Sequence, residues 1–331
     1  MSAAASSNHA SATADSLPPA AEGLWSIAWR QLRRNRLAMV CLAVLGLYTA
    51  LWLYAEGRFW SARVRRVVPA YKKSDYDHRN LPVSVAHPLG TDYAGRDNIS
   101  QIIQGTRIAF EIGVFTSLIA IPLGFGLGAL AGYFGRKVDT AIVYLYSVVD
   151  SVPGILLIMV IAYVVRGAVE RAPFMQTLTR YVDSGLLAVC AGMGFAGWVG
   201  LCRLIRAEYF KHRERQYVLA ARSLGASHCS IMFRHIAPNV LHLIIINFSL
   251  RFPSLILTEV VLSYLGLGIA DEPSWGTIIN DAKQRLWLGY WGELAGATVA
   301  MFFLVLCLNL FGDALRDALD PKLRIAEAKT A

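Results

Sequence analysis

The chain has 331 residues, of which 55% are hydrophobic and 17% charged, and its formal net charge at pH 7 is +9. With a mean hydropathy of +0.44, the composition is too apolar for an ordinary soluble domain with a solvated surface, which indicates a membrane protein. Four of the five cysteines lie in long apolar stretches, where free Cys behaves as a small hydrophobic residue, so the sequence predicts neither a disulfide framework nor a metal site.

The N-terminal 24 residues are rich in Ala, Ser, Thr, Asn and Pro and almost free of large apolar side chains, which predicts a disordered tail. A basic cluster of Arg30, Arg33, Arg34 and Arg36 follows, and then a long apolar run. A secretory signal fits this order poorly, because the basic residues come after the tail and the apolar run is long enough to span a membrane. We therefore expect this run to be the first transmembrane helix of the mature protein.

Six apolar stretches are long enough to cross a bilayer, which takes about 20 helical residues. Four of them contain no charged residue: 37–55, 112–134, 185–202 and 294–312. The stretch 140–165 is interrupted only by Asp150, and 240–268 carries Arg251 and Glu259. The sequence therefore predicts an all-α, polytopic membrane protein with six transmembrane helices.

The charge distribution leaves the orientation of these helices open. Lys and Arg fall almost equally on the two sides, and the basic loop after the first helix, with Arg58, Arg63 and Arg65, argues against cytoplasmic termini. The net positive charge would suit anionic membrane lipid or a partner, although basic loops beside spans are also the ordinary expectation. No motif suggests nucleic-acid binding.

A polar segment, 205–239, separates the fourth and fifth apolar stretches and is far longer than a turn requires. Up to Leu224 it has no Gly or Pro and favours helix, with Tyr217, Val218, Ala221 and Leu224 recurring on one face. This spacing predicts a short amphipathic helix.

A turn and a second helical piece are expected after this helix. Gly225 permits the left-handed conformation that ends a helix, Ser227 suits an N-cap, and Pro238 is expected to stop the second piece before the membrane. Ala220 and Ala221 would leave a flat surface that a groove on another protein can approach closely. The alternative is an amphipathic loop lying on lipid headgroups.

The stretch QYVLAARSLGASHCSIMFRHIAPN (216–239) resembles the "EAA" loop of bacterial ABC importer permeases. Ala220, Ala221, Gly225 and Pro238 match its spacing, whereas Leu219 stands where the family usually has Glu. The resemblance implies cytoplasmic coupling helices that dock in a cleft of the ATPase subunit. The residues that it assigns to ATPase coupling are Tyr217, Leu219, Ala220, Ala221, Gly225, Ala226 and Pro238.

Four further stretches resemble the second permease of peptide and nickel importers: HPLGTDYAGRDNISQIIQGTR (87–107), DSVPGILL (150–157), EVVLSYLGLG (259–268) and NLFGDALRDALDP (309–321). The resemblance implies the type I ABC importer permease fold in a bacterial inner (plasma) membrane, with both termini and the 205–239 loop cytoplasmic. It divides the chain into a tail (1–24), a first transmembrane helix with a periplasmic loop (25–108), a transmembrane permease core (109–313) and a cytoplasmic C-terminal tail (314–331).

The resemblance also implies partners: a paralogous permease subunit, two ATPase subunits and an external solute-binding protein. ATP and Mg would bind to the ATPases, and no cofactor is expected in this chain. Peptides, dipeptides, glutathione and nickel complexes are all carried by similar permeases, so the solute stays open.

Charged side chains at membrane depth are expected to face the protein interior or a water-filled path. Asp150 and Arg251 lie at similar depths, so we expect them to pair between the third and fifth helices and to line the translocation path. Glu259, a little over two turns beyond Arg251, would lie near the pore mouth. For all three, a buried polar contact that locks helices together is an equally good interpretation.

A transport subunit without a catalytic centre is the leading functional hypothesis, and the sequence has no GxxxxGK[ST] phosphate loop. An ion-gradient-driven secondary transporter is the alternative; Gly and Pro within 121–132 would form one broken helix, but the second half shows no counterpart. An intramembrane hydrolase is disfavoured because the histidines form no HExxH motif and no GxSxG motif is present.

Overall fold

The computed structural model describes residues 24–171, 183–269 and 272–319, and within these ranges the chain is almost entirely helical. In the described part of the chain, extended pairing is limited to one isolated bridge between Thr91 and Asp97. The longer helices are α1 (Leu24–Arg34), α2 (Arg36–Arg65), α3 (Asn98–Phe134), α4 (Arg136–Ser151), α5 (Gly154–Arg171), α7 (Ser184–Gly197), α8 (Val199–His212), α11 (Ala237–Tyr264) and α13 (Gly292–Leu319). The short ones are η1 (Ala70–Lys72), η2 (Tyr76–His78), α9 (Gln216–Ser223), α10 (His228–Ser230), the π-helical η3 (Ile231–Ile236), α12 (Trp275–Ala282) and η4 (Leu286–Leu288).

Five helical stretches of the described chain are long and apolar enough to cross a membrane: α2, α3, α7 with α8, α10 through α11, and α13. The third predicted span is a broken one, because α4 and α5 meet at a 97° bend. The bend falls at Val152 and Pro153, where Val152 is extended, as a residue before proline prefers. The prediction of six spans is therefore confirmed only if the bent pair of α4 and α5 counts as one span.

Helix α3 is the centre of the bundle and contacts α2, α4, α7, α8, α11 and α13. Its closest approach is to α8, where Gly124, Gly128 and Gly132 present a face without side chains. A Cβ at Gly128 would lie 2.6 Å from the Cys202 carbonyl oxygen, so only glycine permits this approach. The expected interruption within 121–132 is wrong, since α3 continues through Pro122 and the glycines pack against α8.

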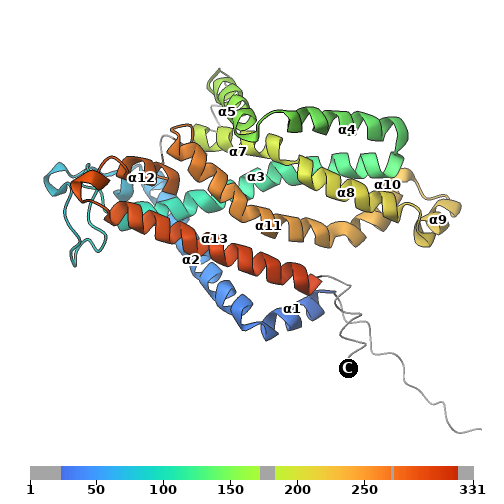
Figure 1. Ribbon diagram of the computed structural model, residues 1–331, viewed down its shortest axis with the longest axis horizontal. Helices are drawn as coiled ribbons and strands as arrows, with labels where there is room; N and C mark the ends of the chain where they lie inside the picture. The colour runs from blue at the N-terminus through green and yellow to red at the C-terminus, as the bar shows by residue number, and fades with distance from the viewer. Residues whose placement is uncertain (1–23, 172–182, 270–271, 320–331) are drawn as a thin grey trace, which may run out of the picture.

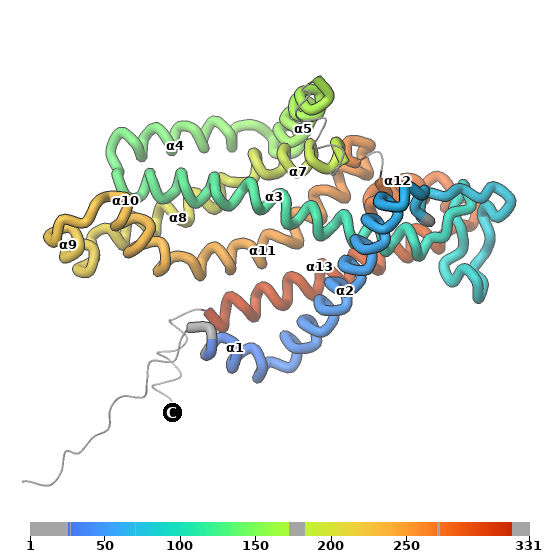
Figure 2. The backbone as a smooth tube through the Cα atoms, turned by 180° about the vertical axis from the view of Figure 1, so that it is seen from behind, coloured from blue at the N-terminus to red at the C-terminus, as the bar shows by residue number. Residues whose placement is uncertain are grey.

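The bundle is elongated and its two ends differ. Figure 1 shows α9 and α10 at one end, and α12 with the connection between α2 and α3 at the other, here called the distal end. Helix α1 packs on α13, and the start of α1 and the end of α13 lie toward the α9 end. The reverse view in Figure 2 shows the same arrangement, so the described chain begins and ends on the side that carries α9.

Two predicted boundaries need correction. The tail was expected to include residue 24, but α1 already begins at Leu24; residues 1–23 and 320–331 lie outside the described ranges. The first span was expected to end with the apolar stretch 37–55, but α2 continues to Arg65. The extension is helical because Phe59 is buried against the bundle, and Arg66 then caps α2 in the left-handed conformation.

Candidate coupling segment and membrane-depth residues

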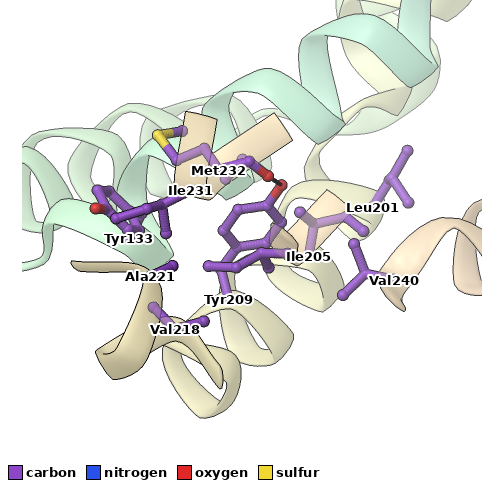
Figure 3. Close-up of a cluster of buried hydrophobic side chains, with 11 residues drawn as sticks. Tyr133, Leu201, Ile205, Tyr209, Val218, Ala221, Ile231, Met232 and Val240 are labelled. Atoms are coloured by element: carbon purple, nitrogen blue, oxygen red, sulfur yellow. Dashed lines mark hydrogen bonds between the residues drawn. The ribbon is translucent and has the colours of Figure 1, made fainter. Parts of the chain in front are cut away.

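Helix α9 is anchored to the end of the bundle by one face. Val218 is fully buried and Ala221 is 8% exposed. Both side chains belong to an apolar cluster contributed by α3, α8, η3 and α11, shown in Figure 3. Tyr209, also in this cluster, donates from its hydroxyl to the Met232 carbonyl at 3.1 Å and so ties α8 to η3. Because these contacts come from four elements, α9 is held as part of the bundle.

The opposite face of α9 is open. Tyr217, Leu219, Ala220 and Leu224 are exposed, and Leu224 is 88% exposed. The predicted apolar face, which joined Leu224 and Tyr217 to the two anchoring residues, is therefore wrong. Helix α9 has only eight residues and ends at Ser223, so Leu224 is already in the cap. Of the two alanines predicted to form a flat exposed surface, only Ala220 is exposed, because Ala221 is buried.

The turn that follows α9 has the predicted form. Gly225 has φ +77°, the left-handed conformation, and nothing lies within 4 Å of its missing Cβ. Ser227 caps α10, its hydroxyl accepting from the backbone N–H of Ser230 at 3.3 Å. Tyr217 lies beside His212, with its hydroxyl 2.8 Å from Nδ1. Burial raises the pKa of Tyr217, so the hydroxyl stays protonated at neutral pH and can donate to a neutral His212 ring.

Pro238 does not end the second helical piece, contrary to the prediction. It lies in the first turn of α11, where a missing N–H is tolerated. The preceding η3 is π-helical, and the Ala237 N–H bonds to the Met232 carbonyl instead of one four residues earlier. The wider turn leaves room for the proline ring, so the helix continues into the membrane-spanning part of α11.

The stretch 87–107 builds the distal end by polar contacts. The buried Asp92 carboxylate accepts from the backbone N–H groups of Ala94 and Arg96, each at 2.8 Å, and from the side chain of Gln101 at 2.9 Å. Gly95 has φ +75°, and a Cβ there would overlap the Asp75 carbonyl. Asp92 and Gly95 therefore stabilise the fold of this loop.

Contacts from this stretch continue into the helices. Arg107 pairs with Glu56 at 2.5 Å and with Glu111 at 2.6 Å, joining α2 to α3. Glu272 accepts from the Tyr71 hydroxyl at 2.8 Å. Burial, and then the charge of Glu272, raise the pKa of Tyr71, which keeps this hydroxyl protonated as a donor.

Asp150 and Arg251 do not pair, which corrects the prediction. The Asp150 carboxylate forms an ion pair with Arg203 of α8, and the guanidinium of Arg203 lies 4.7 Å from the Tyr146 ring. Arg251 instead donates to the backbone carbonyl of Gly197 at the end of α7. Equal depth along the membrane normal does not determine which helix lies beside which, and α8 is the neighbour of α4.

Arg203 is the functional candidate that sequence reasoning missed. It lies one residue beyond the fourth apolar stretch, so a search for basic residues at stretch edges would have found it. A second ion pair, from Arg206 to Asp139, also joins α8 to α4. The charged side chains of Asp150 and Arg203 are both about half exposed in this chain. Charged side chains at membrane depth almost always face protein or water and not lipid.

Glu259 is buried within the chain. It is 2% exposed, and the Ser263 hydroxyl donates to its carboxylate at 2.5 Å. Ser263 also lies against Gly268 and Gly276, so the group joins α11 to the segment leading into α12. The carboxylate is thus placed at a helix junction of the distal end.

These features define a class: a polytopic helical membrane protein with a short helix at one end that is buried on one face and exposed on the other. Within the described ranges, no group of three or more His, Cys, Asp or Glu side chains could hold a metal ion. Residues 124–325 match the profile of the binding-protein-dependent transport system inner membrane component, and residues 23–82 match the N-terminal transmembrane domain of oligopeptide transport permease C.

Curated relatives agree. The chain is 32% identical over 301 residues to a dipeptide transport system permease of Bacillus subtilis, covering 90% of this chain and 85% of the relative. It is 34% identical to a glutathione transport system permease of Pectobacterium atrosepticum, covering 91% and 92%. An oligopeptide transport system permease of Bacillus subtilis is 31% identical, covering 91% and 90%.

The chain belongs to the family of binding-protein-dependent transport system inner membrane components. It is accordingly the permease component of an ABC importer, a transport subunit and not an enzyme, as the sequence predicted. These relationships give no support to the ion-gradient-driven alternative.

Proposed function

We propose that this chain forms half of a translocation path together with a paralogous permease, and that α9 docks onto one of two partner ATPase subunits. ATP and Mg bind to the ATPases, and a solute-binding protein delivers the solute at the distal end. The relatives are named for dipeptide, oligopeptide and glutathione transport, which supports a peptide or a related small solute.

The two-faced burial of α9 is the observation that carries this proposal. Val218 and Ala221 hold the helix to four elements of the bundle, while Leu219 and Leu224 face outward and Tyr217 lies at the edge, half-exposed beside His212. A loop that merely lies on headgroups needs no such anchoring. An element that transmits ATP-driven movement needs both faces, one to receive the ATPase and one to move the bundle.

Leu219 fits this docking role although it replaces the family's usual Glu. It is 43% exposed on the outward face, next to Ala220. An apolar side chain at this position favours a partner cleft lined by apolar groups. A carboxylate at the same position would instead need a basic group in the cleft. Gly225 and Ala226 shape the turn that ends α9, and Pro238 lies where the segment rejoins the membrane.

We further propose that the α9 end is cytoplasmic and that both termini lie on that side. Figures 1 and 2 place the first described residues of α1 and the last of α13 toward this end, which supports the assignment. Asp150 and Arg251 remain our candidates for the translocation path, whereas the burial of Glu259 supports the alternative, a polar contact that locks helices together. Partial exposure of Asp150 and Arg251 supports their part in it.

Co-purification with a matched set of variants tests the docking role. Ala220→Glu adds charge and bulk to the outward face and should reduce the ATPase retained on tagged protein by at least about tenfold, equivalent to roughly 1.4 kcal/mol. Val85→Glu makes a similar change at a fully exposed residue of the distal loop and should have no effect. Ala221→Glu should instead reduce the yield of folded protein, since it buries a carboxylate among apolar side chains.

Three results would defeat the proposal. The first is that no ATPase accompanies the unmodified chain from native membranes. The second is equal ATPase retention by Ala220→Glu and Val85→Glu. The third is solute uptake by the reconstituted complex in the absence of ATP.

A further inference from the structure

A small cavity with a mainly apolar lining and a few polar groups lies at the junction of α3, α7, α8 and α11, at the level of Arg251. It has a volume of about 20 Å³, and its polar lining comes from Thr116, Ser117, Asn247 and Arg251. The remaining lining is apolar, and includes Leu201 and Leu255. Asn247 and Arg251 are partly exposed, so the cavity opens to the surface of the chain.

Arg251 brings an uncompensated positive charge to this cavity. It lies near the middle of α11, and no Asp or Glu of the described ranges lies within ion-pair distance of it. Within the described ranges its guanidinium donates one hydrogen bond, to the Gly197 carbonyl. A guanidinium has five N–H donors, so most of them stay available to a ligand. A charge without a counter-charge is costly at membrane depth even when it is partly exposed, so the site favours an anion.

Thr116 is a second, independent sign of a ligand. Its side chain is fully buried, and within the described ranges the Cys190 thiol, a weak hydrogen-bonding group, is the one side-chain partner of its hydroxyl. The hydroxyl lines the same cavity as the guanidinium. A buried hydroxyl with only so weak a partner is destabilising, and a ligand oxygen in the cavity would relieve that cost.

The backbone around the cavity leaves space for the guanidinium. The helix is interrupted at Trp198, between α7 and α8, and Gly197 and Gly200 lie on either side of this interruption. A Cβ at Gly197 would lie 3.3 Å from one terminal nitrogen of Arg251, and a Cβ at Gly200 would lie 3.6 Å from the other. The two glycines thus let the side chain reach the carbonyl while part of it faces the cavity.

We propose that Arg251, Thr116 and Asn247 bind one carboxylate group of the solute at mid-membrane, so that the importer selects solutes that carry a free carboxylate. This inference rests on the proposed transport function. The cavity volume exceeds the roughly 10–15 Å³ that one water needs but is far below that of a whole solute, so only the end group enters. Water would satisfy Thr116 yet leave the arginine charge uncompensated, whereas a carboxylate does both.

Chemical protection of Arg251 tests the site without depending on transport. The assembled complex is treated with phenylglyoxal, which modifies arginine, and modification at Arg251 is measured by mass spectrometry. Sodium acetate should slow it at least about threefold relative to an equal concentration of the neutral isostere acetamide, and Thr116→Val should weaken that protection. Equal rates in acetate and acetamide, or protection by sodium chloride as strong as that by acetate, would overturn the proposal, as would an Arg251 that never reacts.

Transport selectivity gives the second measurement. In proteoliposomes, ATP-driven uptake of the dipeptide Ala-Ala is compared with that of its C-terminal amide. Arg251→Gln should lower uptake of the acid to the level of the amide, while Arg251→Lys should retain part of the preference. An unchanged acid-to-amide ratio in Arg251→Gln overturns the inference while leaving the importer function intact. ATP-independent uptake would instead defeat the proposed function, whatever the protection measurement shows.

Discussion

The contact between α3 and α8 allows a prediction with a control on the same helix. A Cβ at Gly128 would lie 2.6 Å from the Cys202 carbonyl oxygen and 3.0 Å from the Cβ of Ile205, whereas nothing lies within 4 Å of the position at Gly126. The Cys202 oxygen is a backbone atom and cannot rotate away. Gly128→Ala must therefore push the two helices apart, but Gly126→Ala fills empty space.

The size of the effect follows from two terms. Replacing Gly by Ala in a helix gains about 0.5–1 kcal/mol in both variants, and overpacking costs about 1–3 kcal/mol in Gly128→Ala alone. The free energies of unfolding should therefore differ by about 1–3 kcal/mol between the two variants, with Gly126→Ala the more stable. Titration of the purified protein with SDS, followed by circular dichroism, measures this difference. Equal stability of the two variants would refute the close glycine packing.

Two further predictions concern the ion pair and the orientation. In a double-mutant cycle of unfolding free energy, Asp150→Asn and Arg203→Gln should couple by about 0.5 kcal/mol or more. Asp150→Asn and Arg251→Gln should instead be additive within about 0.5 kcal/mol. The reverse pattern would restore the pairing of Asp150 with Arg251 that was expected from their depth. Cys229 is exposed beside α9, so a membrane-impermeant maleimide should label it in inside-out vesicles but not in intact spheroplasts, while Val85→Cys at the distal end should show the opposite accessibility. Labelling of Cys229 from outside the cell would invert the proposed topology.

The spans were predictable because the bilayer imposes a length and a polarity on each helix. The stretches without charge all fall within the long helical spans, one of which is interrupted at Trp198, and Asp150 marks the stretch that is sharply bent. The break itself had a signal in the sequence, since Pro153 follows Val152 and precedes Gly154. Its angle of 97° depends on how α4 packs against α3 and how α5 packs against α7, which no local pattern records.

Side-chain partners were less predictable than spans. Depth in the membrane can be counted along a helix, but rotation about the bundle axis cannot, and so Asp150 was matched with Arg251 instead of Arg203. The prediction of which residues form the buried face of α9 was wrong for a related reason. Over eight residues, helical spacing defines only two turns, and Val218 and Ala221 are buried by a cluster that includes α3, which is distant in sequence.

Helix α8 connects the features that the proposed function requires. Its C-terminal end leads through Arg213 into α9, and its N-terminal end adjoins Trp198 and Gly197, where Arg251 donates to the backbone. The 14 residues of α8 span about 20 Å at 1.5 Å per residue. Close glycine packing against α3 and the ion pairs to α4 oppose bending along this length. A displacement of α9 by an ATPase would therefore be carried by α8 as a rigid element to the level of the Arg251 cavity, where the glycines on either side of Trp198 offer little resistance to a change in the backbone.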